Sequence, residues 1–397
     1  MTKNKTRILI ILLALCLFSC QKQPDNSIGN NKEVQSVQLI LEGYNSDETD
    51  TKTTYESISG GFIFNWAAGD VVGIITAEGN QLKFPIRSEY YGQSHAEFDG
   101  RGFALVSGEE YYSYYPFIPD YDINLTAVPI SYEGQYQTGN DDATKLGAYA
   151  YCLASGSAPS QGTLVFSYKN VGSPHIYRVP CLAASYTKLT LTAPDSRFVI
   201  NGTLDLTAET VEELIAITPV SHSPEMQLDL INTSMSEPGR LTCRLMVPPV
   251  DLSDGILRLT LTMADGSSII ASVPGRDCPA NTRRTSNALT AVYPGEQTIA
   301  SDGGDIVIKL IKTAESNAVT ITSVSPWLSQ KSSSIEGLVT TYVFTASENT
   351  GEARLGEISF TETETGMINT VKINQGKAGT IIGIGSWDSE NHQGTAN

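Results

Sequence analysis

Positive charge is scarce in this chain of 397 residues, and long apolar runs are absent. Lys and Arg together number 26, of which three lie within the first nineteen residues, against 43 Asp and Glu. Beyond residue 19 there are thus 23 basic and 43 acidic groups, a net charge of −20. Such a surface repels polyanions, so no nucleic-acid partner is expected. No apolar run reaches the roughly 20 residues that a membrane-spanning helix needs.

Enzyme signatures are also missing. The histidines are far apart and form no His-Glu-x-x-His pair for zinc; they are His95, His175, His222 and His392. The chain has neither a Gly-x-Ser-x-Gly elbow nor a phosphate-binding Gly-x-x-x-x-Gly-Lys loop. Asp and Glu are plentiful, but no segment places two carboxylates in a recognisable glycosidase context. We expect no enzymatic activity, no metal and no cofactor.

The first nineteen residues predict an export signal that is removed. Three basic residues precede the apolar run Ile8–Phe18, which at eleven residues is too short to be a permanent anchor. The signal ends in Leu17-Phe18-Ser19-Cys20, which resembles the lipobox of bacterial lipoproteins. That resemblance implies cleavage before Cys20 and a lipid on this cysteine, hence a membrane contact through the lipid. The alternative is an ordinary secretory signal with a chance cysteine.

Residues 20–33 are polar and predict a flexible tether between the lipid and the folded part. The lipobox resemblance therefore implies that the folded part is tied to a membrane by this lipid.

Four cysteines remain after the signal and the lipidated cysteine are set aside: Cys152, Cys181, Cys243 and Cys278. Disulfides persist outside the inner membrane, and four cysteines allow three pairings. No two are close enough in sequence for a Cys-x-x-Cys metal or redox motif. Cys152 and Cys181 lie in apolar, strand-like sequence, so buried thiols and disulfides both remain open.

Alternation of apolar and polar residues with period two dominates the chain and predicts an all-β protein of tandem sandwiches. The folded part opens with a strand over 34–42, whose inward face is Val37, Leu39 and Leu41. Leu257 to Met263 alternates in the same way before the turn Ala264–Ser267. Helical periodicity is scarce, and the best candidate is 208–217.

Composition suggests where the β units begin and end. The small-residue stretch 155–162 suits a linker. After Tyr293 the Tyr-rich sequence gives way to strands rich in Ser, Thr and Glu. We predict units at 34–160, 161–293 and 294–377, followed by a Gly-rich tail at 378–397. Each unit is long enough to bury a two-sheet core.

Several stretches of the first two units resemble the fimbrillin family of Bacteroidetes surface lipoproteins. The resemblance covers 34–293 and is carried by Phe64–Ile74 with its Trp-x-x-Gly-Asp, Tyr111–Phe117, Phe166–Gly172, Val247–Pro249 and 281–292. It implies two tandem transthyretin-like β domains without catalytic function. It also implies a lipid-anchored location at the outer membrane, with the folded part at the cell surface or in a fimbria.

The third unit resembles a BACON domain, an immunoglobulin-like module named for its association with carbohydrate-active proteins. The match spans 296–376 and is carried by Ser325–Leu328, Glu348–Arg354, Ile358–Phe360 and Val371–Gln375. The family name implies glycan binding, but many members act as spacers, and no binding site is transferred.

Aromatic clusters have both a structural and a binding interpretation. In a strand, successive side chains of Tyr111–Phe117 point to opposite sheet faces, so this run is expected to form core and sheet edge instead of a sugar platform. Trp66 and Trp327 lie in strand motifs and are expected to be buried. Trp387, in the tail, has no structural explanation and is a candidate glycan contact. Trp327, in the BACON-like unit, is the other candidate glycan contact.

The fimbrillin resemblance implies assembly by strand exchange. A protease removes the first strand, and a strand of the next subunit fills the exposed groove. The first basic residue after the strand 34–42 is Lys52, which is therefore the candidate cleavage site. The chain has no arginine between Arg7 and Arg87, which argues against an arginine-specific protease.

Two functions follow. The first is a fimbrial tip or accessory subunit or adhesin, favoured over a shaft subunit because the third unit departs from a two-domain pilin; its partners are other fimbrial subunits. The alternative is a surface lipoprotein that binds a glycan or host surface, or acts as a spacer in carbohydrate utilisation.

Overall fold

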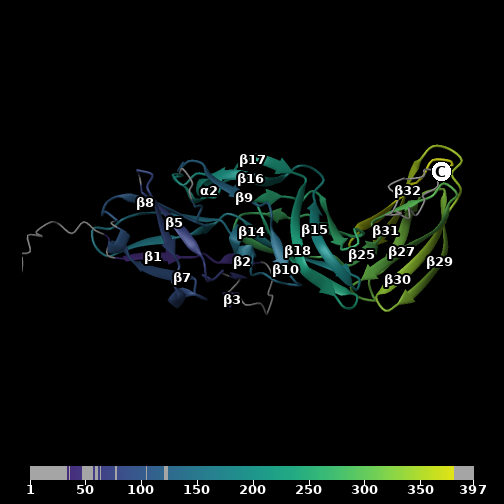
Figure 1. Ribbon diagram of the computed structural model, residues 1–397, viewed down its shortest axis with the longest axis horizontal. Coiled ribbons are helices and arrows are strands. Elements are labelled where there is room, and N and C mark those ends of the chain that lie inside the picture. The colour runs from purple at the N-terminus through teal and green to yellow at the C-terminus, as the bar shows by residue number, and fades with distance from the viewer. Residues whose placement is uncertain are drawn as a thin grey trace, which may run out of the picture.

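The computed structural model describes residues 34, 36–46, 57–58, 61–62, 64–76, 78–103, 105–119 and 124–379. Their structure is almost entirely β, arranged as successive sandwiches along one long axis (Figure 1). This confirms the predicted fold class. In this part of the chain no helix is long and apolar enough to cross a bilayer.

The first unit packs two sheets around one hydrophobic core. The core includes Val37, Leu39, Trp66 and Phe84. One sheet has the order β12 (Thr163–Ser167), β1 (Ser36–Ile40) and β7 (His95–Asp99). The other has the order β13 (Lys169–Asn170), β11 (Cys152–Ser157), β8 (Glu110–Tyr115), β5 (Val71–Thr76) and β6 (Gln81–Pro85). Two 3-10 turns join these strands, η1 (Ser88–Tyr90) and η2 (Gly100–Phe103).

The second unit holds the largest core. One of its sheets has the order β19 (Gly239–Val247), β14 (Ser173–Cys181), β24 (Thr282–Asn287), β2 (Tyr44–Ser46), β4 (Gly61–Phe62) and β3 (Ser57–Ile58). A facing sheet begins with β10 (Tyr136–Thr138), β18 (Glu225–Met235), β15 (Ala184–Thr192), β21 (Ile256–Met263) and β22 (Ser268–Pro274). Smaller elements are β17 (Thr218–Ser223), β16 (Phe198–Leu204), β9 (Val128–Ser131), β20 (Val250–Asp251), β23 (Asp277–Cys278) and η3 (Leu146–Tyr149).

The third unit continues that facing sheet. From β22 the sheet passes to β25 (Thr290–Tyr293), β27 (Gly304–Lys312), β30 (Val339–Ala346) and β29 (Leu328–Glu336). Four further strands form its second layer, β26 (Glu296–Ile299), β32 (Ile368–Gln375), β31 (Arg354–Glu362) and β28 (Val319–Val324). The core between the layers contains Ile306, Phe344, Phe360 and Val371.

The structure differs from the predicted units at both junctions. Strand β12 follows the expected 160/161 boundary, yet it pairs with β1, and its Leu164 and Phe166 belong to the first core. At the other junction Ile270 and Val292 pair across β22 and β25 and pack in the third core. Strand pairing thus carries the first unit past residue 160, and the third core reaches back before residue 294. Residues of 128–150, expected in the first unit, pack in the second core instead.

The only α-helix in the described residues is much shorter than the expected 208–217. It is α2 (Val211–Leu214), which starts at a capping box formed by Thr210 and Glu213. The hairpin expected around Ala264–Ser267 is present between β21 and β22, and Leu257, Leu259 and Leu261 face the core as predicted.

The Tyr111–Phe117 run lies between two cores, which confirms its structural interpretation. Tyr111 packs in the first core and Tyr114 in the second, because neighbouring positions of β8 point to opposite faces. Ser113, on the first-core face, donates a hydrogen bond to the Gly73 carbonyl at 2.9 Å and lies 2.6 Å from the Tyr168 hydroxyl. The sheet containing β8 is therefore a shared wall between the first and second units.

Side-chain amides cover the free edge of β19. Gln135 binds both the amide and the carbonyl of Met246 at 2.8 Å. Gln137 accepts from the Arg244 amide at 2.9 Å and donates to the Thr242 carbonyl at 2.8 Å. These two glutamines, both almost fully buried, take the place of a neighbouring strand, so this edge offers no free ladder to another chain.

Burial on β1 alternates strictly, which makes a matched pair of variants available. Leu39 is fully buried, whereas its neighbour Ile40 points outward. We expect Leu39→Ala to lower the free energy of unfolding by about 2–5 kcal/mol, because a core cavity is created. Ile40→Ala should cost about 1 kcal/mol or less. Urea unfolding followed by tyrosine fluorescence measures both; equal losses would contradict the described orientation of β1.

Candidate functional site

Strand β1 is the central strand of its sheet, with neighbours on both sides. It runs parallel to β12 and antiparallel to β7. Its residue Leu39 lies opposite Phe166 on one neighbour and Ala96 on the other, and all three are buried. Because backbone bonds and apolar contacts are made on both sides, removal of β1 would leave an apolar trough bordered by two unpaired strand edges.

Hydrogen bonds extend the pairing beyond both ends of β1. At the start, the Val34 amide donates to the Leu105 carbonyl at 3.0 Å. At the end, the Leu41 amide donates to the Ser94 carbonyl at 2.8 Å, and the Tyr168 amide donates to the Ile40 carbonyl at 2.9 Å. The groove therefore holds a segment longer than the five residues of the strand itself.

The same segment then enters the second unit. Four residues after β1, strand β2 pairs in parallel with β24 and antiparallel with β4. Residues 36–46 thus contribute one strand to each of two sheets, so their loss would open the first sheet and a second-unit sheet together.

At the junction between β1 and β2, Glu42 makes two contacts with the strand β13. The Lys169 ammonium lies 2.8 Å from the Glu42 carboxylate, and both side chains are about one-third exposed. The Asn170 amide nitrogen donates to the Glu42 carbonyl oxygen at 3.1 Å and to the Asn281 side-chain oxygen at 2.9 Å. Asn170 is buried, so it links the end of the first strand to the second unit.

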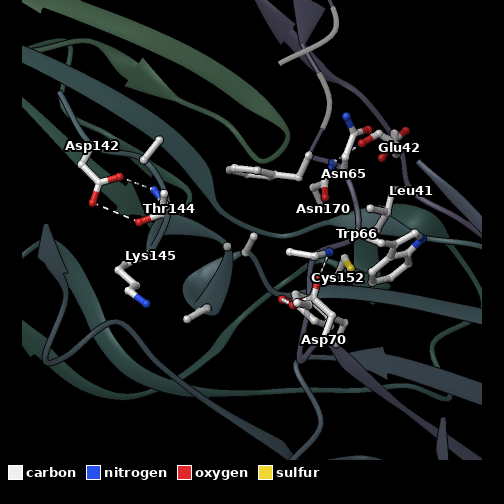
Figure 2. A pocket seen from close by; sticks show the side chains of 18 of the residues that line it. Leu41, Glu42, Asn65, Trp66, Asp70, Asp142, Thr144, Lys145, Cys152 and Asn170 are labelled. Atoms are coloured by element: carbon white, nitrogen blue, oxygen red, sulfur yellow. Dashed lines mark hydrogen bonds between the residues drawn. The ribbon is translucent and has the colours of Figure 1, made fainter. Parts of the chain in front are cut away.

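A pocket of about 530 Å³ opens beside this junction. One wall belongs to the first unit and includes Leu41, Glu42, Trp66 and Asp70. The opposite wall is the segment 141–148 of the second unit, and Figure 2 shows the two groups facing each other across the space.

The first wall is held together by Asp70. Its carboxylate accepts from the Ala67 amide at 2.8 Å and from the Tyr115 hydroxyl at 2.9 Å. Burial raises the pKa of Asp70 above its usual value, while these two hydrogen bonds act in the opposite direction. Trp66, as predicted, is buried; its ring packs edge-on to Tyr115, with centroids 5.6 Å apart.

The acids of the opposite wall are also occupied by local contacts. Asp142 accepts from the amide of Thr144 at 2.9 Å and from its hydroxyl at 3.0 Å. Asp141 is ion-paired with the buried Arg244 at 2.6 Å. The pocket carboxylates thus serve to shape their loops, and the arrangement offers no positioned acid–base pair. Among the described residues no group of His, Cys, Asp and Glu is arranged to hold a metal.

Three of the residues predicted from sequence lie outside the described part of the chain, namely Cys20, Lys52 and Trp387. The fourth, Trp327, is half-buried instead of fully buried. Its ring centroid lies 4.4 Å from the Arg354 guanidinium carbon. A Cβ added at Gly356 would come within 2.4 Å of the indole, so the ring lies directly against that backbone. Trp327 therefore packs on β31, at the edge of the third core.

All four cysteines of the folded part are buried free thiols, so the structure favours that alternative over disulfides. Burial raises the pKa of every one of them, that of Cys181 to about 11 and that of Cys278 to about 12. Thiols in this state are protonated and poorly nucleophilic at neutral pH.

Sequence reasoning identified the apolar face of the first strand but missed Glu42, Lys169 and Asn170. The Glu42–Lys169 pair joins positions 127 residues apart, and only the parallel pairing of β1 with β12 brings them together. No local pattern signals such a contact.

Known proteins that are similar to this chain are found among solved structures. No family model and no curated protein matches it. Among solved structures, a candidate cell adhesion protein of Bacteroides ovatus is 14% identical at a TM-score of 0.37, covering 64% of this chain and 91% of its own. A second candidate cell adhesion protein, from Bacteroides fragilis, is 13% identical at a TM-score of 0.35. The match covers 64% of this chain and 92% of that chain.

The tip fimbrial protein Mfa3 of Porphyromonas gingivalis, with a C-terminal truncation, is also similar. It is 10% identical at a TM-score of 0.29, and the match covers 60% of this chain and 81% of that one. Likenesses of this size show no family and transfer no function.

The raised pKa of Asp70 predicts a pH dependence of stability with a defined sign. The folded state binds the Asp70 proton more tightly than the unfolded chain, whose carboxyl has a pKa of about 3.9. As pH rises through this pKa, loss of the proton therefore makes Asp70 progressively less favourable to folding. Relative to Asp70→Asn, the wild type should therefore gain stability as pH is lowered.

Asp99 supplies a control of opposite sign. Its hydrogen bonds and ion pair with Arg101 lower its pKa, so wild type should lose stability relative to Asp99→Asn as pH falls. Urea unfolding of the three proteins across the acid range measures both differences. Parallel pH profiles for wild type and Asp70→Asn would contradict the buried environment of Asp70.

The buried cysteines predict complete protection in the folded state. In a chain that starts at residue 21, no thiol should react with a disulfide reagent at neutral pH, and four should react after unfolding. Fast reaction of any thiol in the native protein, or fewer than four after unfolding, would show an exposed site or a disulfide.

Proposed function

We propose that this protein is a non-catalytic surface lipoprotein of the fimbrillin type that acts as a fimbrial tip or accessory subunit or adhesin and joins its neighbours by strand exchange. The observation that carries the proposal is the position of β1, a short central strand at the start of the folded chain with its apolar face fully buried. The fimbrillin-like motifs of 34–293 support it.

Strand exchange needs a segment that can leave without dismantling the rest. Residues 36–46 reach two sheets, but of the residues 34 and 36–43 none lies in the second or third core. The apolar residues that would be released are Val34, Val37, Leu39 and Leu41, all in the first core. At about 1.5–3 kcal/mol for each fully buried side chain, their burial is a strong driving force for refilling the groove.

The β19 edge of the second unit does not compete for an incoming strand. The β19 edge is occupied by Gln135 and Gln137. Their contacts keep an incoming strand from adding at β19.

The third unit lies at the opposite end of the long axis from β1 (Figure 1). In the proposal, a subunit with this arrangement receives a strand at one end and presents the BACON-like unit at the other, which suits a tip or accessory position. A lipid on Cys20 anchors the unprocessed chain to the outer membrane, and cleavage after Lys52 releases both the anchor and the first strand.

N-terminal sequencing of the protein from cells tests the proposal. We expect a mature chain that begins at Thr53, and we expect Lys52→Ala to prevent this cleavage while Lys32→Ala, before the strand, leaves it unchanged. A chain that begins only at lipidated Cys20 contradicts the polymerising role.

The glycan-binding or spacer alternative has its own readout. Binding of the protein to a glycan array that is lost in Trp387→Ala or Trp327→Ala, with the fold intact, would favour it over the fimbrial proposal. Trp387→Ala is the cleaner variant, because Trp327 also packs against Arg354 and Gly356.

A further inference from the structure

The contacts of Glu42 set the end of the β1 segment. The Lys169 ammonium contacts its carboxylate, and the Asn170 amide contacts its carbonyl oxygen. One contact therefore depends on the side chain at this position and the other only on the backbone.

Asn170 is well placed to fix the backbone. It is buried, and its amide nitrogen is also bonded to Asn281 of the second unit. An extended segment in the groove would stop at the same point whatever its sequence, because its carbonyl must meet this donor. Fixing that point fixes the register of every residue before it.

The preceding residues define an apolar pattern. Val37, Leu39 and Leu41 point into the first core, and Ile40 points outward. The residue that meets Lys169 follows the third apolar residue directly. With register set by Asn170, the groove thus matches one arrangement: three apolar residues at alternate positions, then an acidic residue.

We propose that Lys169 and Asn170 form a register clamp that selects the incoming strand for this arrangement. The inference rests on the strand exchange proposed above and specifies its partner: a strand of another protein that carries an acid immediately after its third inward apolar side chain. A strand shifted by one residue would turn its apolar face outward and move its acid away from Lys169.

No register lets the tail of this same chain place three apolar side chains inward and also an acid opposite Lys169. If Ile382 and Ile384 occupy the first two apolar positions, Ser386 takes the third and Trp387 faces Lys169. If Asp388 faces Lys169, the inward positions are Gly383, Gly385 and Trp387. A second copy's tail is therefore a poor occupant, and the clamp favours a heterologous donor.

Peptide exchange into the folded protein tests the clamp. The chain from residue 21 carries an engineered protease site within 47–51 and is cut after folding, so the first strand stays bound without a covalent link. Labelled peptides of residues 34–46 then compete for the groove as the native sequence, Glu42→Gln or Glu42→Lys, beside a tail peptide of residues 380–391. Fluorescence anisotropy measures incorporation and dissociation.

The native peptide should bind about two- to five-fold more tightly than Glu42→Gln, the range of a partly exposed ion pair. Glu42→Lys should bind more weakly still, and the tail peptide weakest. In a Lys169→Glu protein the order of the Glu and Lys peptides should reverse, whereas Lys309→Glu in the third unit should leave it unchanged.

Two failures are distinguishable. If the native, Gln and Lys peptides all enter with equal affinity, strand exchange stands and the clamp is wrong. If not even the native peptide enters the cut protein, both the strand exchange and the clamp that rests on it are overturned.

Discussion

The pairing of β1 with β12 and β7 is the constraint on which the first half of the molecule depends. Strand β12 lies 127 residues after β1, yet the two run in parallel with five residues in register. That pairing brings Leu164 and Phe166 into the first core and places β13, which follows directly, at the end of the first strand. The groove, the junction at Glu42 and the adjoining pocket are all consequences of it.

Strand β1 is paired on both sides within the first unit, and the sheet that contains β8 lies between its core and the second core. The sheet containing β8 separates the first core from the second, with Tyr111 on one side and Tyr114 on the other. Of the residues 34 and 36–43, none lies in the second or third core. The part of the segment around β1 thus contributes four buried apolar residues to the first core without being part of the other two cores.

Sequence patterns predicted the local features well, because those depend on alternation along one strand. The inward face of β1 and the two-sided Tyr111–Phe117 run follow from period two. The burial of Trp66 was predicted from its motif, although the residue lies outside the strands. Features set by pairing between distant strands were not predictable. The boundary at 160/161 was placed by composition, whereas β12 joins the first sheet; Lys169 and Gln137 look like ordinary polar residues until their partners are known.

Hydrogen exchange of the cut protein, before and after residues 34–46 are displaced in mild denaturant, tests whether the first strand is exchangeable. Amides of β7 and β12 should lose protection when the segment leaves and regain it when the peptide is restored, while β27 and β30 of the third unit stay protected throughout. Unchanged protection of β7 and β12, or a loss of protection that extends to the third unit, would contradict the exchangeable strand.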